Sequence, residues 1–180
     1  MSLERYYRVR ATGGGRWARQ EEGTLRLLDG PPWAGPGTGS ETLPLEGAPL
    51  LAPVEATKIV AVGRNYRAHA AERGKAVPAE PLLFYKPLSA VIGPGEAIRH
   101  PGWVGRVDHE AELAVVIGKT ASRLPGPEGA EEHVFGATAV NDVTARELQE
   151  KDVQFTRAKG FDTFCPVGPC LATGLDLGRT

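Results

Sequence analysis

Short apolar runs, each ended by glycine or proline, follow one another along the whole chain. Up to about residue 50 they alternate with Gly/Pro clusters at residues 13–15, 31–32 and 35–37, a pattern typical of hairpins and loops. Strand-like runs then occupy residues 58–62, 82–85, 91–92, 107–118 and 134–140. The pattern predicts a β-rich protein that opens with a small β-rich segment.

Helical features are confined to two short stretches. An alanine-rich centre at residues 63–74 predicts a short helix. A second helix is expected just after Asp142, because Thr144 and Glu147 have the spacing of a capping box, in which each side chain satisfies backbone N–H groups of the first turn. The sequence contains no internal repeat, low-complexity tract or heptad, so it does not fit a solenoid or a coiled coil.

Composition excludes several classes of partner. The 180 residues are enough for one domain with a core, and 21 Lys plus Arg balance 22 Asp plus Glu, so net charge favours neither nucleic acid nor an anionic membrane. Charges at Glu4 and Arg5 do not fit a secretory signal. The longest apolar runs, such as residues 113–117, are too short to cross a bilayer. We therefore expect a soluble cytoplasmic protein without nucleic-acid or membrane partners.

The two cysteines do not indicate a disulfide framework. Cys165 and Cys170 are the only thiols in the chain, and so sparse a pair more often represents two buried thiols. Neither has a histidine beside it in the sequence. A nucleophilic cysteine whose base comes from elsewhere in the fold stays open.

Acidic residues gather at the start of one strand-like run. Glu110 and Glu112 are two apart, so in a strand they project from the same face, with Asp108 on that face too. The residues that follow, 113–117, are all apolar, which predicts a strand buried on both faces. Ion pairing or solvent exposure is the commoner fate of such acids. At the mouth of a buried strand, however, their repulsion also favours a bound cation.

Asp142 adds a third carboxylate, because it closes the next apolar run. Three carboxylates from two neighbouring strand ends are hard oxygen ligands that suit an octahedral Mg²⁺ ion. Asp142 alone would also suit a helix N-cap. Thr144 with Glu147 already supplies that cap, which leaves Asp142 free for another role.

A candidate base and a basic residue lie on either side of this acidic group in the sequence. His69 and Glu72 are three apart in the predicted helix, the spacing at which a carboxylate orients and activates an imidazole. A solvated helix face would give the same pair. Lys159 precedes Gly160, where a glycine lets the backbone approach a ligand, although a surface lysine in a turn explains it equally simply. The same surface interpretation applies to Lys86, Arg64 and Arg146, and Gln149 also fits a helix-surface amide.

Five stretches together resemble the fumarylacetoacetate hydrolase superfamily, and specifically its 2-hydroxyhepta-2,4-diene-1,7-dioate isomerase-like members. They are GRNYRAHAAERG, LLFYKP, VDHEAELAVVIG, VNDVTARELQ and AKGFDTFCPVGP, which occur in the order that marks the superfamily. The resemblance runs from about residue 58 to about residue 171. It is specific because several motifs agree in order and type, whereas Glu-x-Glu alone would mean little.

The resemblance implies an α+β, β-rich fold: a mixed β-roll of the family's C-terminal-domain type at residues 56–180, after a β-rich leader at residues 1–55, in a homodimer. Mg²⁺, or Mn²⁺, with Ca²⁺ as a possible substitute, would be held by Glu110, Glu112 and Asp142. The catalytic positions would be His69, Glu72 and Lys159, and the substrate-binding positions Arg64, Asn65, Tyr66 and Gln149. Family members ordinarily continue past the position of Thr180 with further strands, so we expect an incomplete sequence or a truncated form.

The activity implied by the resemblance is metal-dependent chemistry on a small 2-oxo or 2-hydroxydienoic acid. The cation would polarise the 2-oxo group, His69 with Glu72 would move a proton or activate water, and Lys159 would neutralise the developing charge. We expect isomerisation or decarboxylation of the 2-hydroxyhepta-2,4-diene-1,7-dioate type in aromatic catabolism. Acylpyruvate hydrolysis and oxaloacetate decarboxylation are the alternatives, and a truncated, catalytically silent oxo-acid-binding protein is the alternative of another class.

Overall fold

The computed structural model of the chain describes residues 2–63, 65–67, 74, 76 and 78–176. Its first part is a run of antiparallel strands: β1 (Glu4–Ala11), β2 (Gly14–Glu21), β3 (Thr24–Leu28), β4 (Thr38–Pro44) and β5 (Leu50–Leu51). Alternate residues of these strands, among them Val9, Ala18 and Leu25, are almost completely buried in one apolar cluster. The predicted hairpins of the leader are confirmed, because the turns at Gly13 and Gly23 each join two strands that pair directly.

The rest of the chain is also mostly strand. Its elements are β6 (Ile59–Gly63), β7 (Leu82–Lys86), β8 (Val91–Ile92), β9 (Val107–Asp108), β10 (Ala111–Ile117), β11 (Val134–Asn141), β12 (Thr144–Ala145), α2 (Arg146–Lys151), α3 (Thr156–Lys159), β13 (Cys165–Pro166) and β14 (Leu171–Thr173), with single turns of 3₁₀ helix at Pro32–Ala34, Leu88–Ala90 and Ala130–His133. The pairing is mixed, since β13 and β8 are parallel whereas the other pairs are antiparallel. The β-rich α+β class predicted from the sequence is confirmed.

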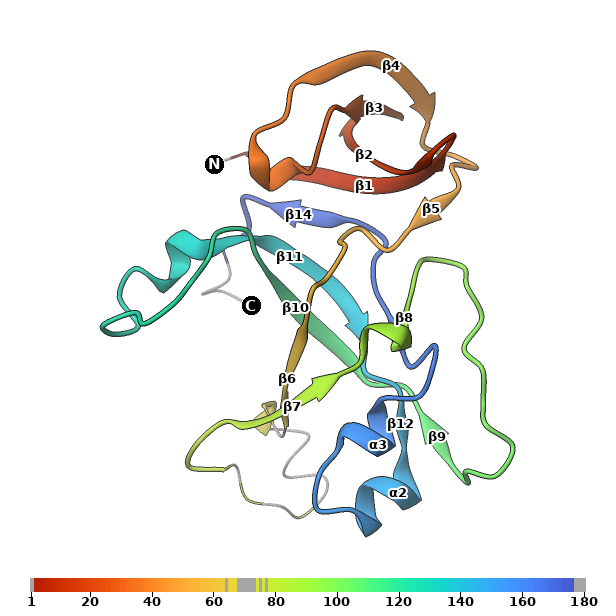
Figure 1. The fold of residues 1–180 in the computed structure, drawn as a ribbon, viewed down its shortest axis with the longest axis vertical. Coiled ribbons are helices and arrows are strands. Elements are labelled where there is room, and N and C mark those ends of the chain that lie inside the picture. The colour runs from red at the N-terminus through yellow and green to blue at the C-terminus, as the bar shows by residue number, and fades with distance from the viewer. Residues whose placement is uncertain (1, 64, 68–73, 75, 77, 177–180) are drawn as a thin grey trace.

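One large sheet joins the two ends of the chain. Its strand order is β10-β11-β14-β1-β2-β3-β4, with β5 paired to β1, and Figure 1 shows β14 lying between β11 and β1. Aromatic contacts strengthen this junction, because Trp33 packs edge-on against both Trp17 and Phe135. The sheet therefore contains strands from both sides of the predicted boundary between residues 55 and 56. The division into two domains at that boundary stays a prediction.

Two short ladders meet end to end beside helices α2 and α3. β10 pairs with β11 from Ala111↔Asn141 onward, and β9 pairs with β12 through Thr144↔Asp108. Between them regular pairing lapses, and the Asp142 N–H donates to the Glu110 carbonyl oxygen at 2.9 Å. An interrupted strand changes direction, so side chains near the break converge instead of alternating strictly between two faces.

Three predictions about local structure need correction or stay open. The capping box is wrong: α2 begins at Arg146 after Ala145 without a side-chain cap, and the Thr144 hydroxyl oxygen instead accepts from Lys159 Nζ. Burial of residues 113–117 on both faces is also wrong. Leu113, Val115 and Ile117 are 46–57% exposed, since described residues cover only one face of β10. The predicted helix at 63–74 lies largely outside the described residues.

No helix in the described part of the chain is long and apolar enough to cross a membrane.

Candidate active site

The ammonium group of Lys159 lies between two of the predicted carboxylates. Its Nζ is 2.6 Å from Glu110 Oε2 and 2.6 Å from Asp142 Oδ2, and it also donates to Thr144 Oγ1 at 2.8 Å. The residue is only 3% exposed. The interruption between β9 and β10 places Glu110, the end of β11 places Asp142, and the short helix α3 carries Lys159 to them. The structure thus brings together residues 110, 142 and 159.

Further cations complete this cluster. Lys86, at the end of β7, is 3% exposed and bonds to Asp142 Oδ1 at 2.6 Å. Arg146, the first residue of α2, contacts Asp108 Oδ2 at 2.7 Å and Glu110 Oε1 at 2.5 Å. Three cations and three carboxylates therefore alternate through the interior, an arrangement in which each charge is compensated on burial. We call residues 86, 108, 110, 142, 146 and 159 the charge cluster.

The surface interpretations of Lys86, Arg146 and Lys159 are wrong. Lys86, Arg146 and Lys159 are all more than 90% buried, because each finds a carboxylate partner inside the protein. Gly160 allows close packing, since a Cβ there would lie 2.9 Å from Pro87 Cδ, and its role in the approach of a ligand stays a prediction. Thr144, fully buried, also belongs to the cluster although the sequence pointed to it only as a helix cap.

Glu112 stands apart from its acidic neighbours. Among the residues that the structure describes, no Lys or Arg nitrogen lies within 4.0 Å of its carboxylate. Burial, followed by the nearby charges of Asp142 and Glu110, raises the pKa of Glu112, against the opposing effects of Lys159 and a hydrogen bond with Tyr66. The third carboxylate of the predicted set is therefore affected by the charges of the other two, and no Lys or Arg in the described chain pairs with it directly.

Glu110 has the opposite electrostatic environment. Burial alone would raise its pKa, but Lys159 and Arg146 together hold the pKa below its usual value. At the outer end of the cluster, hydrogen bonds from Arg106 and Arg146 lower the pKa of Asp108 to about 2. Both carboxylates are thus charged at neutral pH, and the protein has arranged specific donors for each of them.

The other predicted residues are only partly placed. Gln149 is half-buried, and its Oε1 accepts from Arg146 Nη1 at 2.9 Å, so it belongs to the wall of the cluster. Tyr66 reaches the strand that carries Glu112, with its hydroxyl 3.4 Å from the Leu113 N–H. Asn65 is exposed beside it. Arg64, His69 and Glu72 lie outside the described residues.

The donor set fits a divalent cation in its chemistry. Three carboxylates are the hard oxygen ligands that Mg²⁺ and Mn²⁺ prefer, and the raised pKa of Glu112 shows that its charge is poorly compensated. In the arrangement observed, however, Glu110 and Asp142 are bonded to Lys and Arg, and no three Asp, Glu, His or Cys side chains in the described ranges form a ready-made metal site. Metal binding therefore stays a prediction.

The described thiols do not have the properties of a nucleophile. Cys165 is fully buried and Cys170 half-buried, both free. Burial raises the pKa of Cys165 to about 11, and it raises the pKa of Cys170 as well. Since the thiolate is the reactive form, neither thiol is suited to act as a nucleophile.

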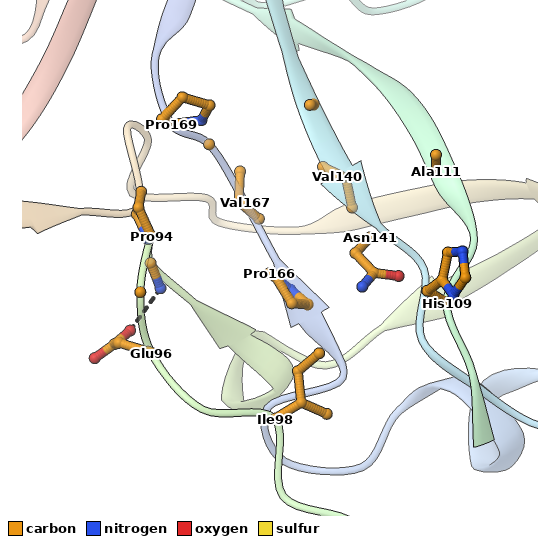
Figure 2. Close-up of a pocket in the computed structure, with 14 residues that line it drawn as sticks. Pro94, Glu96, Ile98, His109, Ala111, Val140, Asn141, Pro166, Val167 and Pro169 are labelled. Atoms are coloured by element: carbon orange, nitrogen blue, oxygen red, sulfur yellow. Dashed lines mark hydrogen bonds between the residues drawn. The ribbon is translucent and has the colours of Figure 1, made fainter.

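A shallow pocket of about 470 Å³ lies next to the charge cluster but does not include it. Figure 2 shows it between residues 93–98 and the strands β10, β11 and β13, with His109 and Asn141 at one side. Its single acidic side chain, Glu96, is engaged by the Gly93 N–H at 2.5 Å. None of the three predicted metal ligands lines it, so the candidate site is the charge cluster with Glu112.

Replacing Glu112 with glutamine is expected to stabilise the metal-free protein at neutral pH. Folding raises the pKa of this carboxyl above its ordinary value of 4.5, so the folded protein takes up the proton more readily than the unfolded chain. The Glu112 contribution to stability therefore falls as pH rises from 4.5 through the raised pKa. Glutamine has no charge and so removes this loss of stability at high pH. Urea unfolding in the presence of EDTA, repeated at a series of pH values, measures the free energy of unfolding of both proteins.

Glu110→Gln is the matched comparison, because Lys159 and Arg146 lower the Glu110 pKa and the charged form stabilises the fold. That variant is expected to lose stability at neutral pH. If both variants lose stability alike, the distinction between the two carboxylates is wrong.

Comparison with known proteins agrees with the motifs. Residues 58–179 match the family model described as fumarylacetoacetate (FAA) hydrolase C-terminal, and residues 4–53 match the one described as Rv2993c-like, N-terminal. Protein Rv2993c of Mycobacterium tuberculosis is 44% identical over 161 residues, which cover 89% of this chain and 60% of that protein. Oxaloacetate tautomerase YisK of Bacillus subtilis is 43% identical over 138 residues, which cover 74% of this chain and 46% of that protein.

The fold has solved counterparts as well. The crystal structure of 2-hydroxyhepta-2,4-diene-1,7-dioate isomerase from Mycobacterium marinum superposes with a TM-score of 0.84 at 38% identity, over 96% of this chain and 67% of that one. The chain thus spans 60% of the length of the mycobacterial relative and 46% of the Bacillus one.

Proposed function

The chain belongs to the fumarylacetoacetate hydrolase family, and we propose that it moves a proton within a small 2-oxo acid as a tautomerase or isomerase assisted by a divalent cation. The observation that carries the proposal is the position of Lys159, a buried ammonium group 2.6 Å from each of two carboxylates, whose charges raise the pKa of a third, Glu112. Mixed charge of this kind, shielded from water, is suited to stabilising an anion that develops during reaction.

The residues have distinct parts in this proposal. Glu110, Glu112 and Asp142 would hold the cation, which supplies Lewis-acid polarisation of a 2-oxo group when bound. Lys159, which is bonded to Glu110 and Asp142, would stabilise the negative charge of the substrate carboxylate or enolate. His69, oriented by Glu72, moves the proton between carbon and oxygen. The family resemblance supports the last two roles, and Gln149 and Tyr66 are candidates for substrate contacts.

The proposed substrates are dicarboxylic acids that interconvert between enol and 2-oxo forms. A 2-hydroxyhepta-2,4-diene-1,7-dioate is the enol of a 2-oxo acid, and oxaloacetate tautomerises by the same transfer of a proton. The Mycobacterium marinum isomerase and the Bacillus subtilis tautomerase carry these two names, so one type of chemistry covers both relatives. We place the 2-hydroxyhepta-2,4-diene-1,7-dioate type first, with decarboxylation as a possible later step.

A substrate panel tests the proposal. The protein is incubated with the dienoic diacid, oxaloacetate and an acylpyruvate, with Mg²⁺ or with EDTA, while enol absorbance and product masses are followed. Magnesium-dependent loss of enol with unchanged mass supports the proposal. Release of carbon dioxide together with one lighter acid identifies a decarboxylase. Formation of two smaller acids identifies a hydrolase. Magnesium-dependent binding of oxalate by calorimetry, without turnover of any compound, identifies a silent binding protein.

The His69→Ala variant is expected to lose turnover while it keeps the metal. Removing a general base typically lowers the rate by about 10²–10⁴-fold, whereas the proposed oxygen ligands are unchanged. Steady-state rates and calorimetric titration with Mg²⁺ measure the two effects separately. His100→Ala is the control, since this exposed imidazole contacts only the Gly105 carbonyl among the described groups. Loss of metal binding in the His69 variant would assign that residue a different role.

A further inference from the structure

Strand β7 presents two side chains to the charge cluster and the others outward. Phe84 and Lys86 are each 3% exposed, whereas the alternate residues Leu83 and Tyr85 are 53% and 59% exposed. The inward pair converges on one residue. The Phe84 ring lies 5.6 Å from Lys159 Nζ, and the ammonium group of Lys86 donates to the Lys159 backbone carbonyl. A single strand therefore positions Lys159 at both its side chain and its backbone.

The contacts of Lys86 connect two residues of the site. Its Nζ is 2.6 Å from Asp142 Oδ1, while Lys159 Nζ is 2.6 Å from Asp142 Oδ2. With each carboxylate oxygen held by a different ammonium group, the plane of the Asp142 carboxylate is fixed. The Lys159 carbonyl, at the end of α3, belongs to the last turn, where carbonyl groups lack partners within the helix. Lys86 supplies that missing donor.

We propose that Lys86 is a positioning residue: it orients the Asp142 carboxylate for cation binding and anchors the backbone from which Lys159 reaches the substrate. The inference rests on the proposed function, because it assigns Asp142 and Lys159 the roles given there. Lys86 itself touches neither cation nor substrate in this proposal. Its effect passes through the two groups that it bonds, in the way that outer hydrogen bonds orient ligating side chains in metal sites.

The direction in which cation affinity changes when Lys86 is replaced distinguishes a positioning role from simple neutralisation of charge. If Lys86 only neutralised Asp142, removing the ammonium group would make the net charge around the site more negative and strengthen the binding of a divalent cation. If Lys86 orients Asp142, its removal lets the carboxylate rotate toward Lys159, and cation binding weakens. Lys86→Met tests this, because methionine keeps a long flexible side chain and removes the charge and all three donors.

The experiment is a calorimetric titration of the metal-free protein with Mn²⁺, with oxalate binding to the Mn²⁺-loaded protein as the second measurement. We expect Lys86→Met to weaken Mn²⁺ binding about 10- to 100-fold, as observed when ligand-orienting groups are removed. Lys58→Met is the matched control: Lys58 is exposed beside Ile59, the cross-strand neighbour of Lys86. Because its charge is screened by solvent, Mn²⁺ affinity should stay within about twofold.

The outcomes are distinct. Unchanged or tighter Mn²⁺ binding by a folded Lys86→Met protein overturns the positioning role and leaves the proposed function intact. A wild-type protein that binds neither Mn²⁺ nor oxalate overturns the proposed function itself. Should Lys86→Met fail to fold, as judged by circular dichroism, the change in Mn²⁺ affinity is measured with Lys86→Gln instead. The glutamine amide keeps donors in the interior, but it is neutral and its side chain is one atom shorter. Weaker binding again supports the proposal, and equal or tighter binding rejects it.

Discussion

Replacing Asp142 with asparagine is expected to lower the free energy of unfolding by about 3–5 kcal/mol, the usual effect of removing one partner from a buried ion pair. Asp142 is 6% exposed and bonds to two ammonium groups that are each 3% exposed. Asparagine preserves the size of the side chain, so the loss measures charge rather than packing. Without the carboxylate, Lys86 would lose its only charged partner among the described residues. Urea unfolding of the metal-free protein measures the change.

Asp152→Asn is the control for this variant. Asp152 pairs with Arg157 at the surface, where solvent and salt weaken the interaction, so its loss should matter far less. Equal stability changes at the two positions would show that Asp142 is not held as the structure describes.

Replacing Lys159 with methionine is expected to lower kcat by about 10²–10³-fold, the range observed when one donor to a developing anion is removed. The proposed reaction builds negative charge on the substrate, and Lys159 is a buried cation bonded to two of the three acids. Its removal also leaves Glu110 and Asp142 with fewer donors, so the urea midpoint of the metal-free protein should fall. Rates with the preferred substrate of the panel and Mn²⁺ titration are measured together.

Lys151→Met serves as the reference, since Lys151 is exposed at the end of α2 and should affect neither quantity. A Lys159→Met protein that turns over normally with Mn²⁺ bound would remove this ammonium group from the mechanism, while the other assignments would stand.

The strands could be predicted from the sequence because their determinants are local. The runs at residues 58–62 and 134–140 became β6 and β11 nearly as predicted, since β-branched residues and flanking turns act over a few positions. Whether the two faces of a strand are buried depends on which other parts of the protein pack against them. The composition of residues 113–117 could not show that Leu113 and Ile117 would be exposed, because a continuous apolar run has no alternation to distinguish its two sides.

The charge partners were harder to predict than the acids. Glu110 and Asp142 stand out at the ends of apolar runs, whereas Lys86 and Arg146 look like any surface residue when taken singly. One signal was present: Lys86 is two positions after Phe84 in a strand, so both share a face, and that face is buried. No local pattern indicates that a carboxylate 56 residues further along the chain receives the lysine.

Thr144 shows how two local rules compete. Its spacing from Glu147 favours a capping box, but the buried Lys159 ammonium requires an uncharged acceptor, and the Thr144 hydroxyl supplies it at 2.8 Å. A buried cation with an unmet donor is more unfavourable than an uncapped helix end that water reaches. The tertiary requirement therefore overrides the local preference.

The placement of β14 between β11 and β1 has a consequence for how the molecule assembles. Leu171 of β14 pairs with Tyr6 of β1, and Ala172 pairs with Ala137 of β11, so β14 joins the leader to β11, the strand that ends next to Asp142. Such pairings close very long loops, which makes their formation slow and late. Residues 1–55 and the strands that follow them thus become one cooperative unit only after nearly the whole described chain has been synthesised.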